Sequence, residues 1–188
     1  MFRRHFLAVV RFFRNKADAD HEDLIQRTFL GCLEARTRFR GESSFRTFLL
    51  GVACNVLRGY YRSKYRSRET LDLGECSLYD LSPSPSAIVA RNQEEQVLLE
   101  ALRRISLDYQ IVLELYFWEE LTAAEIAAAL EIPLGTAQTR LRRAREQLAR
   151  RMEELVETPG LAAAVALNAE VWARGLRGRI AGGAELPG

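Results

Sequence analysis

The residues best suited to do chemistry in this sequence are hydrogen-bonding side chains gathered around residue 140. A glutamine, a threonine and four arginines stand close together: Gln138, Thr139, Arg140, Arg142, Arg143 and Arg145. Glutamine can pair with adenine, and arginine with guanine, in the major groove of DNA. No nucleophile–base pair and no set of histidines or cysteines at ligand spacing accompanies them. The sequence therefore predicts binding chemistry, with no catalytic residue, metal site or cofactor.

Two short helices are expected to position these side chains. Thr122 and Glu125 form a T-x-x-E capping box, which predicts a helix start. Pro133 cannot continue that helix and Gly135 relaxes the turn, so a second helix is expected from Thr136. Small residues of the first helix would let a neighbouring backbone approach closely: Ala123, Ala124, Ala128 and Ala129. This pattern is typical of a helix-turn-helix.

The second helix carries one apolar stripe, which decides what faces outward. The stripe consists of Ala137, Leu141, Ala144 and Leu148, at the spacing of a 3.6-residue period. Gln138, Thr139, Arg142 and Arg143 then lie on the opposite side. The alternative is a solvated basic helix within an ordinary bundle.

Charge is distributed unevenly along the 188 residues, although the net charge is only +2. Nine basic residues face one acid between positions 36 and 68, and seven acids face one base between positions 69 and 100. Six arginines face one glutamate between positions 138 and 151. Two basic stretches separated by an acidic one indicate two DNA-facing surfaces joined by a segment that avoids DNA.

The first basic stretch lies on a long helix expected from Phe45 to about Lys64, after helices over 2–15 and 21–37. Arg46, Asn55, Arg58 and Arg62 line a side different from the apolar one, and the helix ends in YYRSKYRSR. Aromatic residues interleaved with cations suit stacking of unpaired bases and binding of a phosphate backbone. The alternative places Tyr60 in the core with solvated arginines around it. On the 21–37 helix, Leu24, Ile25, Phe29, Cys32 and Leu33 are expected to face inward.

The remaining segments contribute less to the interpretation. Thr70 to Ser86 reads as a linker, and a helix is expected over 87–105, with Ser106 capping the next one. A stripe from Leu161 to Ile180 suggests an amphipathic helix, packed on its own domain, docked on a regulator, or disordered. Three widely spaced cysteines without a C-x-x-C argue against a disulfide framework or a zinc ribbon, and Cys32 and Cys54 are expected in the core. No signal peptide or membrane span is seen, so a cytoplasmic protein is expected.

Taken together, these stretches resemble the compact extracytoplasmic-function (ECF) group of bacterial sigma factors, in the sigma-70 family. HEDLIQRTFLGCLE and FRGESSFRTFLLGVACNVLRGYYR resemble sigma region 2. ALRRISLDYQIVLELYFWEELTAAEIAAALEIPLGTAQTRLRRAREQL resembles sigma region 4. The two motifs stand in the family's order, which is more specific than a lone helix-turn-helix.

The resemblance implies an all-α fold and a division of labour between two small helical domains. They would be a region 2 domain over 1–68 and a region 4 domain over 91–153, joined by a flexible acidic linker over 69–90. A C-terminal helical extension over 154–188 has no counterpart in the family. The implied function is promoter-specific transcription initiation on core RNA polymerase, with no catalytic activity. The alternatives are a stand-alone helix-turn-helix regulator and a pure interaction module.

The resemblance also implies partners and site residues. The chain would contact core polymerase at its clamp helices and at its flap. The contact with the clamp helices would be made by Asp23, Gln26 and Arg27. An anti-sigma factor is also expected. The −35 element would be read by the six side chains from Gln138 to Arg145 named above. The −10 element would contact the loop Arg40, Gly41, Glu42, Ser43 and Ser44, and the helix residues Asn55, Arg58 and Arg62.

Overall fold

The computed structural model describes residues 2–14, 16, 17, 20–38, 41, 43–65, 76, 77, 79 and 93–155. Seven α-helices lie within these ranges: α1 Phe2–Arg14, α2 His21–Glu34, α3 Phe45–Lys64, α5 Gln93–Arg104, α6 Leu107–Phe117, α7 Ala123–Leu130 and α8 Leu134–Leu155. A 3-10 turn, Ala35–Arg38, follows α2. The extended pairing found in this part of the chain is an isolated bridge between Ser77 and Ser106. The prediction of an all-α fold is confirmed.

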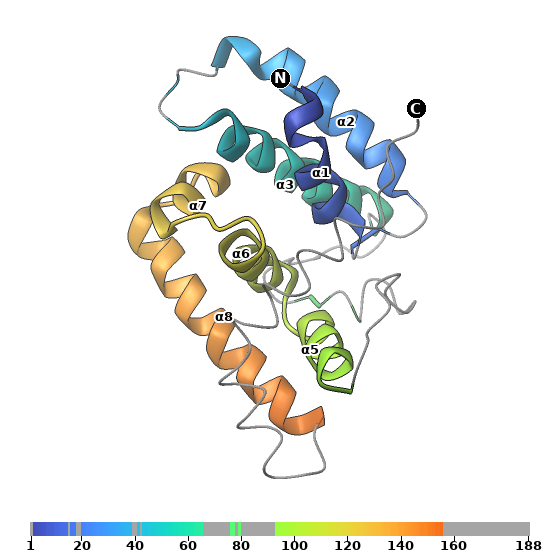
Figure 1. The fold of residues 1–188 in the computed structure, drawn as a ribbon, viewed down its shortest axis with the longest axis vertical. Helices are drawn as coiled ribbons and strands as arrows, with labels where there is room; N and C mark the ends of the chain where they lie inside the picture. The colour runs from blue at the N-terminus through green and yellow to red at the C-terminus, as the bar shows by residue number, and fades with distance from the viewer. Residues whose placement is uncertain are drawn as a thin grey trace.

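Helices α1, α2 and α3 form the first half of the molecule, at the top of Figure 1. Val9 and Phe13 of α1 pack with Leu24 of α2 and Leu57 of α3, and all four are fully buried. Cys32 and Cys54 are buried free cysteines, as expected. Burial raises the pKa of Cys54 to about 12, because an apolar core disfavours the thiolate.

Two apolar residues of α2 do not join that core. Leu33, which the sequence pattern placed inside, is 48% exposed, and Leu30 is 59% exposed. The helical period allows only one stripe to face α1 and α3, and Leu24, Ile25, Thr28 and Cys32 occupy it. The inward assignment of Leu33 was therefore wrong.

Helix α3 begins and ends with well-defined contacts. The Ser44 hydroxyl accepts a hydrogen bond from the Thr47 amide at 3.1 Å, which caps the helix. Near the other end, Tyr61 is buried and donates a hydrogen bond to the Lys16 carbonyl, whereas Tyr60 is only half-buried. The aromatic residue in the core is thus Tyr61 and not Tyr60.

Helices α5 to α8 form the second half around a core that includes Ile105, Ile111, Leu115 and Trp118. Ser106 does precede α6, but its side chain makes no capping hydrogen bond. The described part of α5 begins at Gln93, and the expected helix start at Ala87 lies outside the described residues. None of the helices described here combines the length and apolar character needed to cross a lipid bilayer.

Helices α7 and α8 form the predicted helix-turn-helix. Both bonds of the Thr122–Glu125 capping box are present, and Glu131 ends α7 in the left-handed conformation with φ 53°. Helix α8 starts at Leu134 and not at Thr136, because the Pro133 carbonyl already accepts from the Thr136 and Ala137 amides. The predicted stripe of α8 is buried and extends to Met152.

The two halves contact each other directly, mainly where α3 lies beside α7 (Figure 1). Gly51 of α3 meets the backbone of Ala129 of α7, and a Cβ at position 51 would lie 2.5 Å from the Ala129 carbonyl oxygen. The close approach that the small residues of α7 predicted is therefore made, at Ala129.

Candidate nucleic-acid interface

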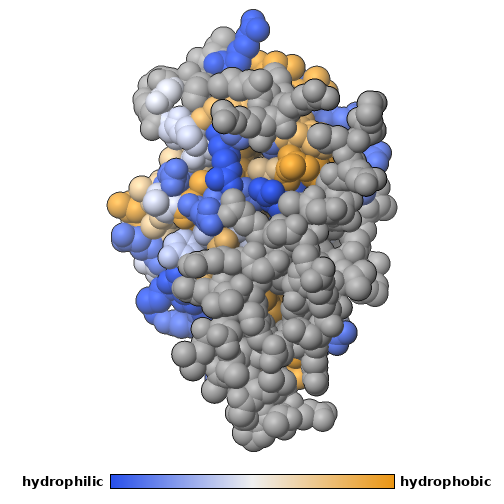
Figure 2. Space-filling model, viewed as in Figure 1, coloured by the Kyte–Doolittle hydropathy of each residue, from blue (hydrophilic) through white to orange (hydrophobic). Residues whose placement is uncertain are grey.

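The outward face of α8 carries the side chains that the sequence pattern placed there. Gln138, Thr139, Arg142 and Arg143 are all exposed, while the opposite stripe is buried. Figure 2 shows hydrophilic residues, with a smaller hydrophobic group among them, along the left edge of the molecule, where Figure 1 places the first half of α8. The buried stripe packs α8 against its own domain, and the opposite face presents hydrogen-bond donors to solvent. A helix that reads the major groove requires this arrangement.

The arginines of α8 have different surroundings. Arg142 pairs with Glu146 one turn later at 2.5 Å, and both side chains are about half exposed or more. The Arg145 guanidinium lies 4.6 Å from the centre of the Tyr116 ring. Arg140 donates to the carboxylate of Asp108 on α6 at 3.2 Å. Arg142 and Arg143 thus point to solvent more fully than Arg140, which is held against its own domain.

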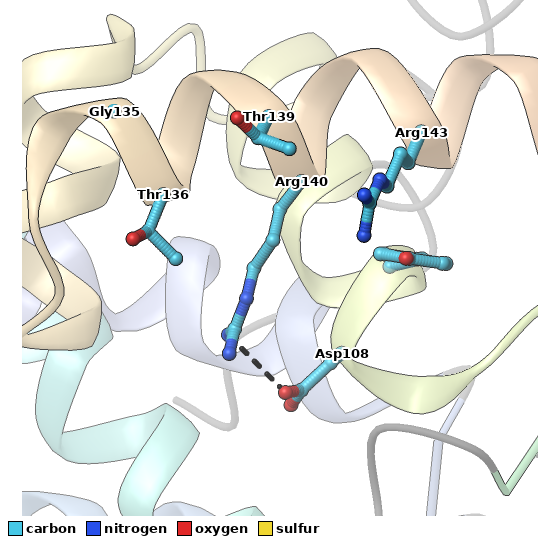
Figure 3. A pocket seen from close by; sticks show the side chains of 7 residues that line it. Asp108, Gly135, Thr136, Thr139, Arg140 and Arg143 are labelled. Carbon is cyan, nitrogen blue, oxygen red and sulfur yellow. Dashed lines mark hydrogen bonds and ion pairs between the residues drawn. The ribbon is translucent and has the colours of Figure 1, made fainter.

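A cleft of about 430 Å³ opens between the start of α8 and the start of α6. Figure 3 shows Thr136, Arg140 and Arg143 projecting from α8 into it, with Asp108 on the facing helix. Its lining also includes Tyr109, Gly135 and Thr139. Guanidinium groups, hydroxyls and a helix N-terminus are donors that suit phosphate oxygens. Asp108 is the exception in this cleft, because it contributes an acceptor and a negative charge.

The second candidate face lies on α3. Asn55 and Arg62 are exposed, as expected for DNA contacts. Arg58 is not: its side chain is 16% exposed, and its guanidinium donates to Asp108 at 2.9 Å. Asp108 thus accepts from one candidate arginine of each basic region.

The loop before α3 is described only in part. Gly41 has φ 75°, a left-handed conformation that favours glycine, and Ser43 and Ser44 lie at the start of α3. Arg40 and Glu42 lie outside the described residues. Near the other end of α3, burial first, and then a hydrogen bond to Asp20, raise the pKa of Tyr60. Tyr61 is in the core, so it cannot stack on a base.

The polymerase-facing candidates lie together on α2. Arg27 pairs with Asp23 at 2.8 Å, with both side chains more than half exposed, and Gln26 is exposed between them. The exposed Leu30 and Leu33 continue this surface by one and two turns. Sequence reasoning missed both leucines, because it assigned Leu33 to the core and made no assignment for Leu30.

Asp108 is the other residue that sequence reasoning missed. Asp108 lies in the first turn of α6, where the helix dipole favours any acidic side chain. Its position in the sequence therefore gives no indication of a functional role. Its two arginine partners come from positions 50 and 32 residues away. Within the part of the chain that the structure describes, no group of three histidine, cysteine or carboxylate side chains could hold a metal ion.

Two family models match the chain in the order of its two halves. The model of sigma-70 region 2 matches residues 1–67, and the model of sigma-70 region 4 matches residues 95–148. The chain belongs to the sigma-70 family. Within that family it is an ECF sigma factor, and its function is promoter-directed transcription initiation, not stand-alone regulation.

Curated relatives agree with this assignment. The RNA polymerase sigma-H factor of Pseudomonas aeruginosa is 27% identical over 157 residues, covering 79% of this chain and 80% of the relative. The ECF RNA polymerase sigma-E factor of Escherichia coli K12 is 28% identical over 145 residues, covering 73% and 76%.

The fold has a solved counterpart in the sigma factor RpoE, in complex with the anti-sigma factor NepR, from Bartonella quintana. The TM-score is 0.55 at 22% identity, over 81% of this chain and 94% of that one. The proposed domain limits and site residues are not tested by these likenesses and stay predictions.

Proposed function

We propose that this sigma factor reads the −35 element with the start of α8. Gln138, Thr139 and Arg143 would contact base edges, because they are exposed and their helix is anchored by a buried stripe. The cleft lined by Thr136 and Arg140 would receive a backbone phosphate. The observation that carries this proposal is the exposed donor face on the second helix of a helix-turn-helix.

The −10 element is assigned to α3 and the loop before it. Asn55 and Arg62 are exposed on α3, and Arg58 lies between them along the helix. The loop from Arg40 to Ser44 would hold a base flipped out of the duplex, a step that requires a few kcal/mol of unstacking energy. The Ser44 side chain caps the start of α3, and a loop anchored at this end would offset part of that free energy.

Core polymerase is proposed to dock on the exposed face of α2. Asp23, Gln26 and Arg27 supply polar contacts, and Leu30 and Leu33 supply apolar area that water otherwise covers. The proposed partner of this face is the pair of clamp helices of the largest polymerase subunit. The proposed partner of the second half of the molecule, α5 to α8, is the polymerase flap. We expect Leu30→Ser with Leu33→Ser to weaken core binding, while binding to a −35 duplex by the variant stays unchanged.

An anti-sigma factor is proposed as a further partner, since the relative of known structure was crystallised with one. The chain itself is proposed to lack catalytic activity and to work beside the chromosome in the cytoplasm. The chemistry of RNA synthesis would belong to the polymerase.

Transcription in vitro with and without this chain tests the proposal. Core polymerase given genomic DNA and the purified chain should start at a defined set of promoters that core alone does not use. Mapping the 5′ ends of the transcripts would reveal the shared −10 and −35 sequences. Failure to bind core, or start sites identical to those of core alone, would refute the proposal.

A further inference from the structure

Leu134 stands apart from the other large apolar residues that the structure describes as exposed. Leu30 and Leu33 belong to the α2 surface proposed to bind polymerase, and a guanidinium carbon lies 5.2 Å from the centre of the Tyr79 ring. Leu134 is 47% exposed and lies outside the apolar cluster formed by the described residues, whereas Ile132 packs against that cluster. Water therefore covers a leucine side chain at the start of α8.

The position of Leu134 in α8 explains its exposure. Leu134 stands three residues before Ala137 and seven before Leu141, so the helical period alone would place it on the buried stripe. It is, however, the first residue of α8. Because a Cα–Cβ bond tilts toward the N-terminus of its helix, a side chain at the first residue points beyond the helix end. Leu134 therefore projects from the tip of α8.

The tip of α8 also carries hydrogen-bond donors proposed to bind the −35 element. Gly135 and Thr136, the next two residues, line the cleft at the start of α8 (Figure 3). Gln138 lies four residues after Leu134, which places the two side chains next to each other on the helix surface, and both are exposed. A leucine thus adjoins the polar side chains of the reading face.

DNA offers one kind of partner for an apolar side chain at the tip of a reading helix. In the major groove the bases present hydrogen-bonding nitrogen and oxygen atoms, and thymine adds a 5-methyl group. The N-terminal residues of a recognition helix are those that reach base edges. A leucine there can bury its methyl groups against a thymine methyl. A donor or acceptor of another base would lose its water next to the leucine without gaining a new partner.

We propose that Leu134 contacts the 5-methyl group of a thymine in the −35 element and selects thymine at that position. Removal of water from the leucine and the methyl group stabilises the complex, and a cytosine amino group at the same place would be left without a hydrogen-bond partner. Leu134 acts beside Gln138 and adds an apolar contact to the hydrogen bonds proposed above. This inference rests on the proposed function, because it takes the −35 role of α8 from it.

Deoxyuridine tests the methyl contact directly, because it differs from thymidine only by the 5-methyl group and keeps the same base pairing. Promoters found by mapping transcript 5′ ends provide the −35 duplexes, and each thymine of either strand is replaced in turn. Holoenzyme containing the wild-type chain should bind about fourfold more weakly when one particular thymine is replaced, the loss expected for one buried methyl-sized group. In Leu134→Ala the same replacement should have almost no effect.

Glu131→Ala is the matched control. Glu131 is exposed at the same turn, three residues before Leu134, and it has no part in the proposed contact. This variant should keep the wild-type difference between the thymine and deoxyuridine duplexes, even if its overall affinity changes. Alanine favours a helix at position 134, and the leucine that it replaces is exposed. Circular dichroism should therefore give equal helix content for Leu134→Ala and wild type.

The inference is overturned if no thymine of the −35 element is sensitive to the loss of its methyl group, or if the sensitivity is unchanged in Leu134→Ala. It is also overturned if Leu134→Ala weakens binding to core polymerase and leaves the methyl effect intact, because the leucine would then face a protein. The proposed function fails through a different result, the absence of promoter-specific starts with core polymerase. Promoters are mapped before any methyl group is removed, so the two failures can be told apart.

Discussion

Arg140 and Arg143 lie one turn apart on α8, yet they have different surroundings. Arg143 is exposed at the mouth of the cleft, whereas Arg140 is turned to Asp108 (Figure 3). An arginine free to rotate can place both guanidinium donors on a guanine edge, while a paired one must first lose its carboxylate. Base reading is therefore assigned more firmly to Arg143 than to Arg140.

We expect Arg143→Ala to weaken binding to a −35 duplex by about 1–3 kcal/mol, the loss typical of a bidentate base contact. Titration of holoenzyme onto promoter and scrambled duplexes measures it. Arg150→Ala, an exposed arginine two turns further along α8, is the control and should weaken both duplexes alike. An equal loss on the two duplexes for Arg143→Ala would make it a phosphate contact instead.

Cys54 gives a prediction about stability and pH. Burial raises the pKa of Cys54 from the ordinary value of 9.0, which we take for the unfolded chain, to about 12 in the core, because it disfavours the thiolate. Above pH 9 the unfolded chain releases a proton that the folded chain keeps. The stabilisation from Cys54 is thus complete below pH 9 and is lost as pH rises from 9 toward 12.

We therefore expect wild type to lose about 1.4 kcal/mol more unfolding free energy per pH unit above pH 9 than Cys54→Ala does. Urea unfolding at several alkaline pH values measures the difference, and the other titrating groups cancel in the comparison. Parallel pH dependences for the two proteins would contradict the buried thiol.

At the scale of elements, the turn between α7 and α8 sets how the reading helix leaves its partner. Glu131 ends α7 with φ 53°, a conformation that side chains with a Cβ adopt at a cost of about 1–2 kcal/mol. The Glu131 amide donates a hydrogen bond to the Ala128 carbonyl, and the Ile132 amide donates one to the Ala127 carbonyl. These two hydrogen bonds end the helix. The turn is thus strained at one residue, while the amides of Glu131 and Ile132 both donate hydrogen bonds to α7.

We expect Glu131→Gly to raise the unfolding free energy by about 0.5–1 kcal/mol, since glycine reaches this conformation without steric conflict. Thermal unfolding of the two proteins measures the gain. Glu131→Ala is the matched control, because it removes the same side chain but keeps the Cβ, and it should give no gain. A gain of the same size in both variants would attribute the effect to charge.

At the scale of the whole molecule, the two halves share one buried core and are joined by ion pairs whose cations come from the first half and whose carboxylates come from the second. The apolar cluster runs from Val9 and Phe13 through Leu57 to Ile126 and Leu148. Lys16 donates to Glu114 and to the Phe12 carbonyl, and its ammonium lies 4.2 Å from the centre of the Phe12 ring. This lysine thus connects the end of α1 with the centre of the second half.

We expect Lys16→Met to open the molecule. An unpaired buried carboxylate costs about 3–5 kcal/mol, and separating the halves returns Glu114 to water. Small-angle X-ray scattering of the free chain should give a larger radius of gyration than for wild type, while circular dichroism should detect little loss of helix. Lys64→Met, at an exposed position of α3, should stay compact. Adding Glu114→Gln to Lys16→Met should restore compactness. Global unfolding without an expanded helical state would contradict this expectation.

Much of the fold could be predicted because it depends on neighbours in the chain. The capping box at Thr122, the buried stripe of Ala137, Leu141, Ala144 and Leu148, and the span of α3 all follow from spacing within one helix. Leu33 was misassigned because one-dimensional periodicity cannot tell which apolar residue meets a partner helix. The sequence pattern also could not tell that Tyr61, and not Tyr60, lies in the core, for the same reason.

The amino-acid order alone determined the helices, the outward donors of α8, the uneven charge and the kinship with sigma factors. Those features are local, because helical period and capping act over three or four residues. Only the tertiary structure decided that Asp108 pairs with both Arg58 and Arg140 and that Gly51 meets Ala129. Such contacts join residues far apart in the chain. They form only where the surfaces of different helices match in shape and charge, which no local pattern encodes.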